Sequence, residues 1–98
     1  MTIEKNLNGT ELNVKVSGRL DTTTAPQLEG ELIASYEGIE TLILDLEDLE
    51  YLSSAGLRVL LQAQKAMNKL GEMIIRNVNE TVSEIFDITG FSDILTIE

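Results

Sequence analysis

The chain has 98 residues, of which 43% are hydrophobic, and seventeen acidic residues against seven basic ones give it a formal charge of −10. This length suits one domain with a hydrophobic core, so we expect residues 1–98 to form a single domain, and the negative charge disfavours binding to nucleic acid or anionic lipid. The chain has neither cysteine nor histidine, which excludes disulfide bonds, Ser-His and Cys-His catalytic pairs and the usual structural zinc sites.

The first part of the chain predicts a β-hairpin. Leu12 to Ser17 alternates apolar and polar residues, as a half-buried strand does, and the alternation stops at Gly18. Thr2 to Leu7 is a weaker strand, joined to it through the turn Asn8-Gly9. The N-terminal residues lack the basic region and apolar core of a signal peptide, and no apolar run reaches about 18 residues. We therefore expect a cytoplasmic protein that does not insert into a membrane.

A helix is predicted within and after the segment GRLDTTTAPQLE. Asp21 to Thr24 supply N-cap candidates, and Pro26 falls where an early proline costs a helix little. Leu28, Leu32 and Ile33 recur at helical spacing, and the helix is expected to end near Tyr36.

The central segment LILDLEDLEYLSSAGLRVLL predicts a buried strand, a turn and a long helix. Thr41 to Leu46 is a short apolar run, typical of a strand buried on both faces of a parallel sheet. The acidic turn Glu47 to Glu50 lacks the spaced oxygen ligands and the glycine of a calcium loop, so we interpret it as a solvated turn and expect no metal site. The helix should run from Ser54 to Leu70 and end at Gly71 in a left-handed conformation.

The remaining segments complete an alternation of strands and helices. Glu72 to Val78 predicts another buried strand, Asn79 caps a third helix that Gly90 terminates, and Ile94 to Ile97 predicts a last short strand. Such alternation favours right-handed crossovers and an α/β fold. We expect a four- to five-stranded mixed sheet with three to four helices packed mainly on one face.

Ser53 and Ser54 stand between a predicted strand and the long helix. A serine hydroxyl at a helix start caps the helix by accepting a hydrogen bond from an unpaired backbone amide. Such a serine is also accessible, Ala55 and Gly56 leave room for another molecule to approach, and a helix N-terminus tolerates added phosphate. Both interpretations stay open, a structural cap and a modified hydroxyl, and in the second Ser54 is a substrate and not a catalytic nucleophile.

The long helix predicts two apolar surfaces. At about 100° per residue, one stripe faces the sheet. Its members are Gly56, Val59, Leu60, Ala63, Ala66, Met67 and Leu70. Leu57 and Leu61 lie on another side, in polar company, so we predict a partner-binding surface of Leu57, Arg58 and Leu61. Alternatively, Leu57 and Leu61 pack under the third helix or a loop.

Asp21 and Asp45 each lie at or just after the end of a predicted strand. Because the C-terminal ends of parallel strands share one edge of a sheet, where the long helix also begins, we expect both carboxylates near Ser54. Alternatively, Asp21 caps the first helix and Asp45 binds the backbone at the end of its strand.

Three segments resemble the STAS domain family, in its stand-alone form the anti-sigma factor antagonist of bacteria. GRLDTTTAPQLE is similar to that family's early Gly-x-Leu-Asp-x-x-Thr-Ala-x-x-Leu segment, the central segment to its strand and phosphorylation loop, and FDITGF to the end of its closing helix. The resemblance implies phosphorylation of the serine two positions before the glycine, which is Ser54. Ser53, standing where well-known antagonists have Asp, is a second candidate. The residues that would support the loop are Asp21, Asp45, Ala55 and Gly56.

The resemblance implies a partner-switching cycle. The unphosphorylated chain would bind an anti-sigma factor that is also a serine kinase and so release a sigma factor. Phosphorylation of Ser54 would abolish binding, and a metal-dependent serine phosphatase would restore it. On this interpretation the chain is a monomer, needs no cofactor and is not an enzyme.

Two other functions are weighed against this cycle. One is a non-phosphorylated STAS subunit of a lipid-transport ATPase complex or a signalling scaffold, in which Ser54 would only cap a helix. The other is a small nucleotide-binding or enzymatic protein. The absence of a Gly-x-x-x-x-Gly-Lys phosphate loop and the negative charge both argue against the latter.

Overall fold

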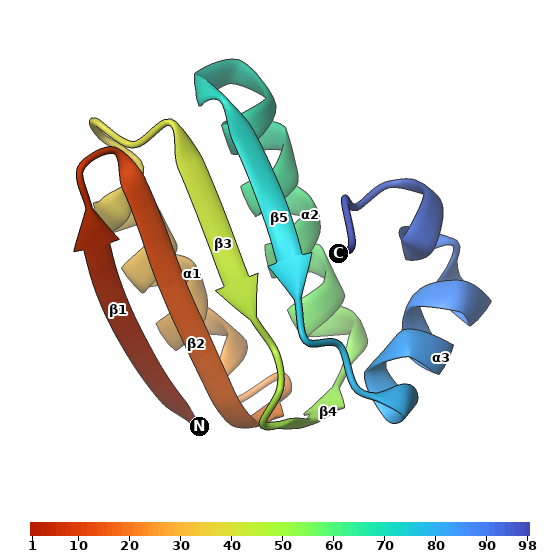
Figure 1. The fold of residues 1–98 in the computed structure, drawn as a ribbon. Coiled ribbons are helices and arrows are strands. Elements are labelled where there is room, and N and C mark those ends of the chain that lie inside the picture. Colours follow the sequence, from red (N-terminus) through yellow and green to blue (C-terminus); the bar gives the residue numbers. More distant parts are fainter.

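The computed structural model describes residues 1–98 and contains a five-stranded mixed sheet with helices packed on it (Figure 1). The strands are β1 (Thr2–Asn8), β2 (Glu11–Leu20), β3 (Thr41–Asp45), β4 (Leu49–Leu52) and β5 (Glu72–Arg76). The helices are α1 (Ala25–Ser35), α2 (Ser54–Leu70), α3 (Glu80–Thr89) and the short 3₁₀ helix η1 (Phe91–Asp93). The predicted α/β fold is confirmed. None of these helices has the length and apolar character needed to cross a membrane.

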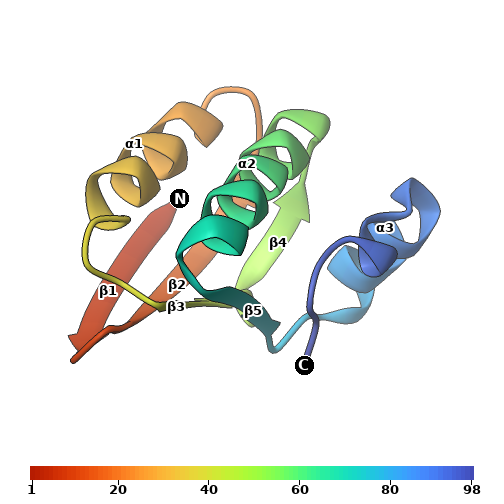
Figure 2. The same ribbon diagram turned by 90° about the horizontal axis from the view of Figure 1, so that it is seen from above.

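The strand order is β1-β2-β3-β5, with β1 antiparallel to β2 and the other neighbours parallel. Both α1 and α2 cover the same face of this sheet, as Figure 2 shows, and the opposite face is uncovered. α3 lies at the side of the sheet and contacts β4 and η1. The prediction that helices pack mainly on one face therefore holds for α1 and α2.

β4 begins within the segment Glu47 to Glu50, which was predicted to be a solvated turn and not a strand. β2 pairs with β3 over Glu11–Lys15 and then with β4 over Gly18–Leu20. The prediction that the strand ends at Gly18 was wrong: Gly18, with φ +92°, pairs with Leu49, and after a register shift Arg19 and Leu20 continue the pairing with β4. The pairing of β2 with β4 is favoured by burial of apolar side chains, since Leu49 and Leu52 at the two ends of β4 are 1% and 2% exposed.

α2 buries a wider face than the stripe predicted for it. Leu57 and Gln64 are each 7% exposed and lie beside the predicted stripe in the interior, whereas Leu70, placed on that stripe by periodicity, is 44% exposed. The sheet and the segments around it therefore cover α2 on more than one side.

Gly71 ends α2 as predicted, but not in a left-handed conformation. Its φ is 166°, an extended value that any residue can adopt. Glycine is needed for another reason: a Cβ at this position would collide with the backbone carbonyl oxygen of Glu40. That oxygen accepts the amide of Glu72 at 3.0 Å, so the chain must pass close to it to begin β5.

The C-terminal segment differs from the predicted strand Ile94–Ile97. Gly90 ends α3 with φ +80°, as expected for a left-handed cap, and η1 then turns the chain back. Leu95 enters the core at 6% exposure, and only Ile97 reaches the sheet, where it forms an isolated bridge with Ile75. The turn at η1 leaves too few residues for a full strand.

Candidate functional site

The start of α2 is held against the end of β2 by backbone pairing and close packing. Leu52 of β4 pairs with Leu20 of β2, and the amide of Ser53 donates to the carbonyl of Leu20 at 2.9 Å. Gly56 faces these two leucines: a Cβ there would lie 2.6 Å from Leu52 Cδ1 and 2.8 Å from Leu20 Cγ. The absent side chain of Gly56 therefore lets the first turn of α2 rest on β2 and β4.

Ser53 and Ser54 have separate roles in this structure. Ser53 is the N-cap, with φ −90° and ψ 175°, and its hydroxyl accepts the amide of Gly56 at 3.4 Å while its carbonyl accepts the amide of Leu57 at 2.9 Å. Ser54 is the first helical residue, and its side chain is exposed and makes no hydrogen bond to another residue. The capping task falls to Ser53, so the hydroxyl of Ser54 is free for other chemistry.

The predicted partner-binding surface is only partly exposed. Leu57 belongs to the hydrophobic core, so the prediction that it lies on an exposed surface was wrong. Arg58 is exposed and Leu61 is half-buried. Leu57 and Leu61 lie one turn apart on α2 but have different surroundings. The rest of the chain closes over the N-terminal end of the helix and buries Leu57. Ser54, Arg58 and the outer part of Leu61 remain accessible on this side of α2.

Asp21 organises the turn that leads from β2 into α1. Its Oδ1 accepts the Thr23 hydroxyl at 2.7 Å and the amides of Thr23 and Thr24 at 3.0 and 3.3 Å. These bonds, led by the Thr23 hydroxyl, hold the pKa of Asp21 below its usual value. The residue lies directly after Leu20, which pairs with β4, so the segment that carries Asp21 lies beside the start of α2. The capping interpretation is close to the observed role, although Thr24 is the formal N-cap.

A cation is stacked beside this turn. The guanidinium of Arg19 lies 4.4 Å from the centre of the Tyr51 ring, and its Nε lies 3.9 Å from Oδ2 of Asp21. Both contacts are exposed at the surface, where such pairs contribute little to stability but orient the side chains. Arg19 is therefore already engaged on the rim of the site.

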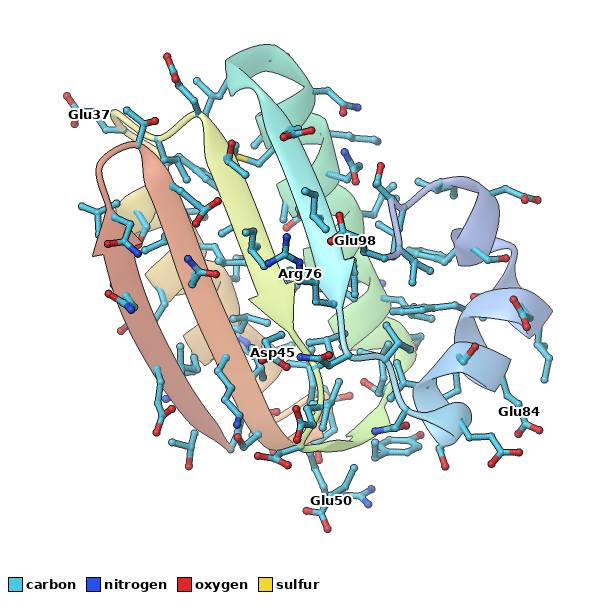
Figure 3. The ribbon with its side chains drawn as sticks, in the orientation of Figure 1. Glu37, Asp45, Glu50, Arg76, Glu84 and Glu98 are labelled. Carbon is cyan, nitrogen blue, oxygen red and sulfur yellow. The ribbon has the colours of Figure 1, made fainter.

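Asp45 lies away from Ser54, contrary to expectation. Its neighbour Leu44 is fully buried on the helix side of β3, so Asp45 lies on the uncovered face, where Figure 3 shows it at the end of the strand. Asp45 pairs in register with Lys15 of β2, whereas the start of α2 is bonded to Leu20, five residues further along the same strand. Five residues of a strand span about 16 Å. Oδ1 of Asp45 accepts the amide of Glu47 at 3.0 Å, as the alternative interpretation proposed. The cause is β4, which carries the chain beyond the end of β3.

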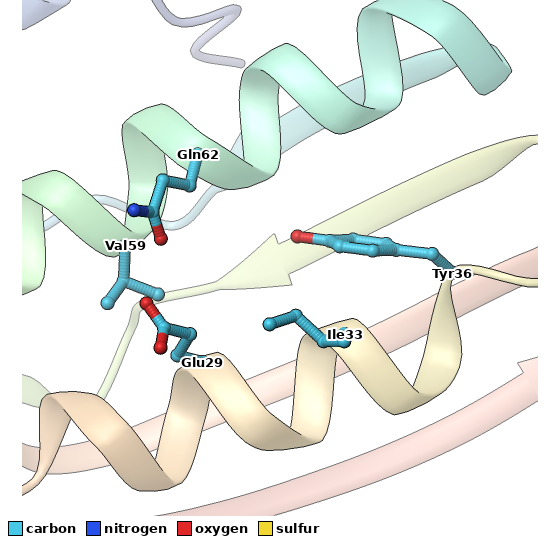
Figure 4. A pocket seen from close by; sticks show the side chains of 5 residues that line it. All are labelled: Glu29, Ile33, Tyr36, Val59 and Gln62. Atoms are coloured by element: carbon cyan, nitrogen blue, oxygen red, sulfur yellow. The ribbon is translucent and has the colours of Figure 1, made fainter.

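A groove between α1 and α2 was not foreseen. Side chains of the two helices face one another across a volume of about 420 Å³ (Figure 4). They are Glu29, Ile33, Tyr36, Val59 and Gln62. Glu29 and Val59 also line a second hollow, of about 210 Å³, at the N-terminal ends of both helices, where Arg58 and Ala55 lie. The two hollows share these two residues, and the second one lies at the start of α2.

The side chains of this groove show why it was missed. Ile33 directly follows Leu32 in α1 but is 63% exposed, whereas Leu32 is 1% exposed. Partial burial of Tyr36, and to a lesser degree the charge of Glu29, raise the pKa of the Tyr36 hydroxyl. Only the crossing of α1 and α2 brings these residues together, so periodicity within one helix could not reveal them.

The other side of the site is acidic. Glu50 projects outward from β4 (Figure 3), and Glu47, Asp48 and Glu80 line a hollow beside it. Asp48 is paired with Lys15 at 3.1 Å, which raises the pKa of that lysine. A partner that faces this rim meets mostly negative charge, so complementary surfaces are basic.

The chain was compared with known proteins. The model of the STAS domain matches residues 2–98. The anti-sigma-B factor antagonist of Bacillus subtilis is 31% identical over 98 residues, which cover 99% of this chain and 90% of that one. The anti-sigma-B factor antagonist of Staphylococcus epidermidis is 35% identical over 86 residues, or 86% of this chain and 80% of that one. The crystal structure of an anti-sigma factor antagonist from Mycobacterium paratuberculosis has a TM-score of 0.89 and 25% identity, with 98% of this chain and 83% of that one covered.

Proposed function

Because this chain belongs to the STAS domain family, we propose that it is an anti-sigma factor antagonist whose binding is switched by phosphorylation of Ser54. The unphosphorylated form binds an anti-sigma factor that is also a serine kinase, and so releases a sigma factor. The observation that carries this proposal is the free, exposed hydroxyl of Ser54 beside a separate capping serine. Phosphorylation at Ser54 leaves the cap of α2 in place.

The chain supplies the acceptor, and the kinase supplies the catalysis. In the kinase active site, Oγ of Ser54 forms a bond to the γ-phosphorus of ATP while the bond from that phosphorus to the departing ADP breaks. The hydroxyl proton passes to a base of the kinase. The product carries about −1.5 to −2 charges at pH 7 on the exposed start of α2. A metal-dependent serine phosphatase removes the phosphate by hydrolysis and restores the hydroxyl.

Several side chains support Ser54 in this role. Gly56 lets the start of α2 pack closely against β2 and β4. The small, half-buried side chain of Ala55 adds little bulk beside the hydroxyl of Ser54. Asp21 holds the neighbouring turn through its hydrogen bonds to Thr23 and Thr24. Ser53 is the weaker candidate for modification, because phosphorylation there would replace the hydroxyl that caps α2.

The partner-binding surface that we propose consists of Ser54, Arg58 and the exposed part of Leu61. In this proposal Leu57 supports that surface from inside, since its side chain is 7% exposed. Added phosphate would place like charge opposite any acidic group of the partner that Arg58 attracts in the free form. The proposed partners, a kinase that uses ATP and a phosphatase of the same system, are consistent with a cytoplasmic protein that acts as a binding module.

The test is to incubate the chain with ATP and each serine kinase encoded by its own genome, and to locate phosphate by mass spectrometry. We expect a single phosphate on Ser54, none on the Ser54→Ala variant, and normal labelling of the matched Ser53→Ala variant. Ser54→Ala should bind the kinase constitutively, and Ser54→Asp should bind it more weakly. Absence of phosphate with every kinase, or labelling of Ser53 alone, would overturn the proposal.

A further inference from the structure

We propose that Arg58 binds the phosphate of phosphorylated Ser54 within the same chain, and that this pairing withdraws Arg58 from the surface offered to the partner. The pairing rests on the modification of Ser54 proposed above and describes how that modification would act. Phosphorylation would then change the surface twice, by adding a negative charge and by removing a positive one.

The helix places the two residues within reach of each other. Ser54 and Arg58 are four residues apart in α2, and both are exposed. Side chains at this spacing lie one above the other on a helix, about 5–6 Å apart at Cβ, and they tilt toward the N-terminus. The side chain of Arg58 therefore leans toward Ser54. An anion that precedes a cation by four residues is also the more favourable order of the two.

Arg58 is free to accept a new partner. The ion pairs of the structure are Lys5–Glu31, Lys15–Asp48, Arg19–Asp21 and Arg76–Glu98. Arg58 takes part in none of them, although it is exposed and lines the hollow at the starts of α1 and α2. Its planar guanidinium can donate two parallel hydrogen bonds to phosphate oxygens. No existing ion pair has to break for this to happen.

Two of the first four backbone amides of α2 are already hydrogen-bonded and cannot donate to a phosphate. The amides of Gly56 and Leu57 already donate to the hydroxyl and carbonyl oxygens of Ser53. Only the amides of the first two helical residues remain without such a partner. The donors left for a phosphate on Ser54 at this helix start are therefore these two amides and the side chain of Arg58.

Among the charged groups around Ser54, Arg58 is the cation that forms no ion pair. Asp21 before α1 and Glu50 on β4 are acidic, and Glu29 on α1 lies at the junction of the groove and the hollow that Arg58 lines. Arg19 on β2 is held by Asp21 and stacked on the Tyr51 ring. Three carboxylates near a new phosphate raise its energy, and Arg58 offsets this repulsion.

The pairing can be tested without any kinase, by preparing the full chain with phosphoserine at position 54 by semisynthesis. The second ionisation of the phosphate is followed by ³¹P NMR as a function of pH. We expect its pKa to be about 0.2 to 0.4 units lower in the phosphorylated wild-type chain than in its Arg58→Gln variant, because the guanidinium favours the dianion. Arg58→Lys should restore part of this shift, since it keeps the charge but not the planar fork.

The matched control is Lys65→Gln. It removes the same charge from the same exposed helix, roughly 16 Å from Ser54 at the usual helical rise, and should leave the phosphate pKa unchanged. Equal pKa values in the wild-type chain and Arg58→Gln, or equal shifts in Arg58→Gln and Lys65→Gln, would overturn the pairing. Amide NMR spectra establish that each variant is folded.

The two proposals fail in distinguishable ways. If no kinase labels Ser54, the proposed function fails, while the semisynthetic phosphoprotein still reports on Arg58. If the phosphate pKa ignores Arg58, the pairing fails, while labelling of Ser54 by a kinase still stands.

Discussion

The hydroxyl of Ser53 accepts the backbone amide of Gly56 at 3.4 Å, so Ser53 and not its neighbour Ser54 caps α2. Ser53 and Ser54 have identical side chains and are adjacent in the chain. Removing the hydroxyl of one should therefore affect stability differently from removing that of the other. One supports the helix, and the other is exposed without a partner in the chain.

Ser53→Ala should lower the free energy of unfolding by about 1 kcal/mol, because the amide of Gly56 loses its acceptor. Ser54→Ala should change it by less than about 0.5 kcal/mol, as expected at an exposed position without hydrogen bonds. Urea denaturation of both variants measures the two values. A larger loss for Ser54→Ala than for Ser53→Ala would contradict the assignment of the cap.

Leu57→Ala should act on stability and not directly on binding. The side chain is 7% exposed within the core, so its truncation should lower the free energy of unfolding by about 2–4 kcal/mol. Leu61→Ala, one turn further along and half-buried, serves as the comparison and should cost markedly less. The measurement is urea denaturation together with partner binding at a temperature where both variants are folded. A Leu57→Ala chain with unchanged stability and lost binding would show that Leu57 touches the partner.

Gly56→Ala should destabilise the chain by about 1–2 kcal/mol, because the new methyl group meets the buried side chains of Leu52 and Leu20. The control is Gly30→Ala in α1, where a Cβ would have no atom within 4 Å. That substitution should instead stabilise by up to about 1 kcal/mol, since alanine favours the helix. Thermal unfolding of the two variants should therefore shift in opposite directions, and a shift in the same direction would argue against close packing at Gly56.

Asp21 should contribute to stability in a pH-dependent manner. Its pKa in the folded chain is lowered from 3.8, first by the Thr23 hydroxyl, so the ionised form is favoured by folding. This contribution is present above pH 3.8 and is lost as the pH falls through the folded pKa. The difference in unfolding free energy between the wild-type chain and Asp21→Asn should therefore shrink on acidification. Urea denaturation on both sides of that range measures it.

Glu37→Gln is the control for this pH dependence. Glu37 is an exposed acid with no hydrogen bond or ion pair to another residue (Figure 3). The change in unfolding free energy that its substitution causes at the two pH values is the baseline with which Asp21→Asn is compared. If Asp21→Asn behaved in the same way, the hydrogen bonds from Thr23 and Thr24 would not be stabilising the carboxylate.

Much of the fold followed from local patterns. The hairpin, the three helices and the strands β3 and β5 were predicted because alternation, helical spacing, caps and glycines act over a few residues. β4 was missed because it has only four residues, of which one is acidic and only Leu49 and Leu52 are buried, and because the acids Glu47 and Asp48 directly precede it. The C-terminal strand was overpredicted because an apolar run does not reveal the turn that η1 makes before it.

The candidate site divides in the same way. The sequence by itself determined that a serine pair followed by a small residue and glycine begins a helix, and that Arg58 lies one turn after Ser54, because both depend only on neighbours along the chain. Only the tertiary structure decided that Ser53 is the cap, that Leu57 is buried, that Asp45 lies on the far face and that α1 and α2 enclose a groove. These depend on contacts between segments distant in the chain, above all the pairing of β2 with β4, and no local pattern encodes which residues such contacts cover.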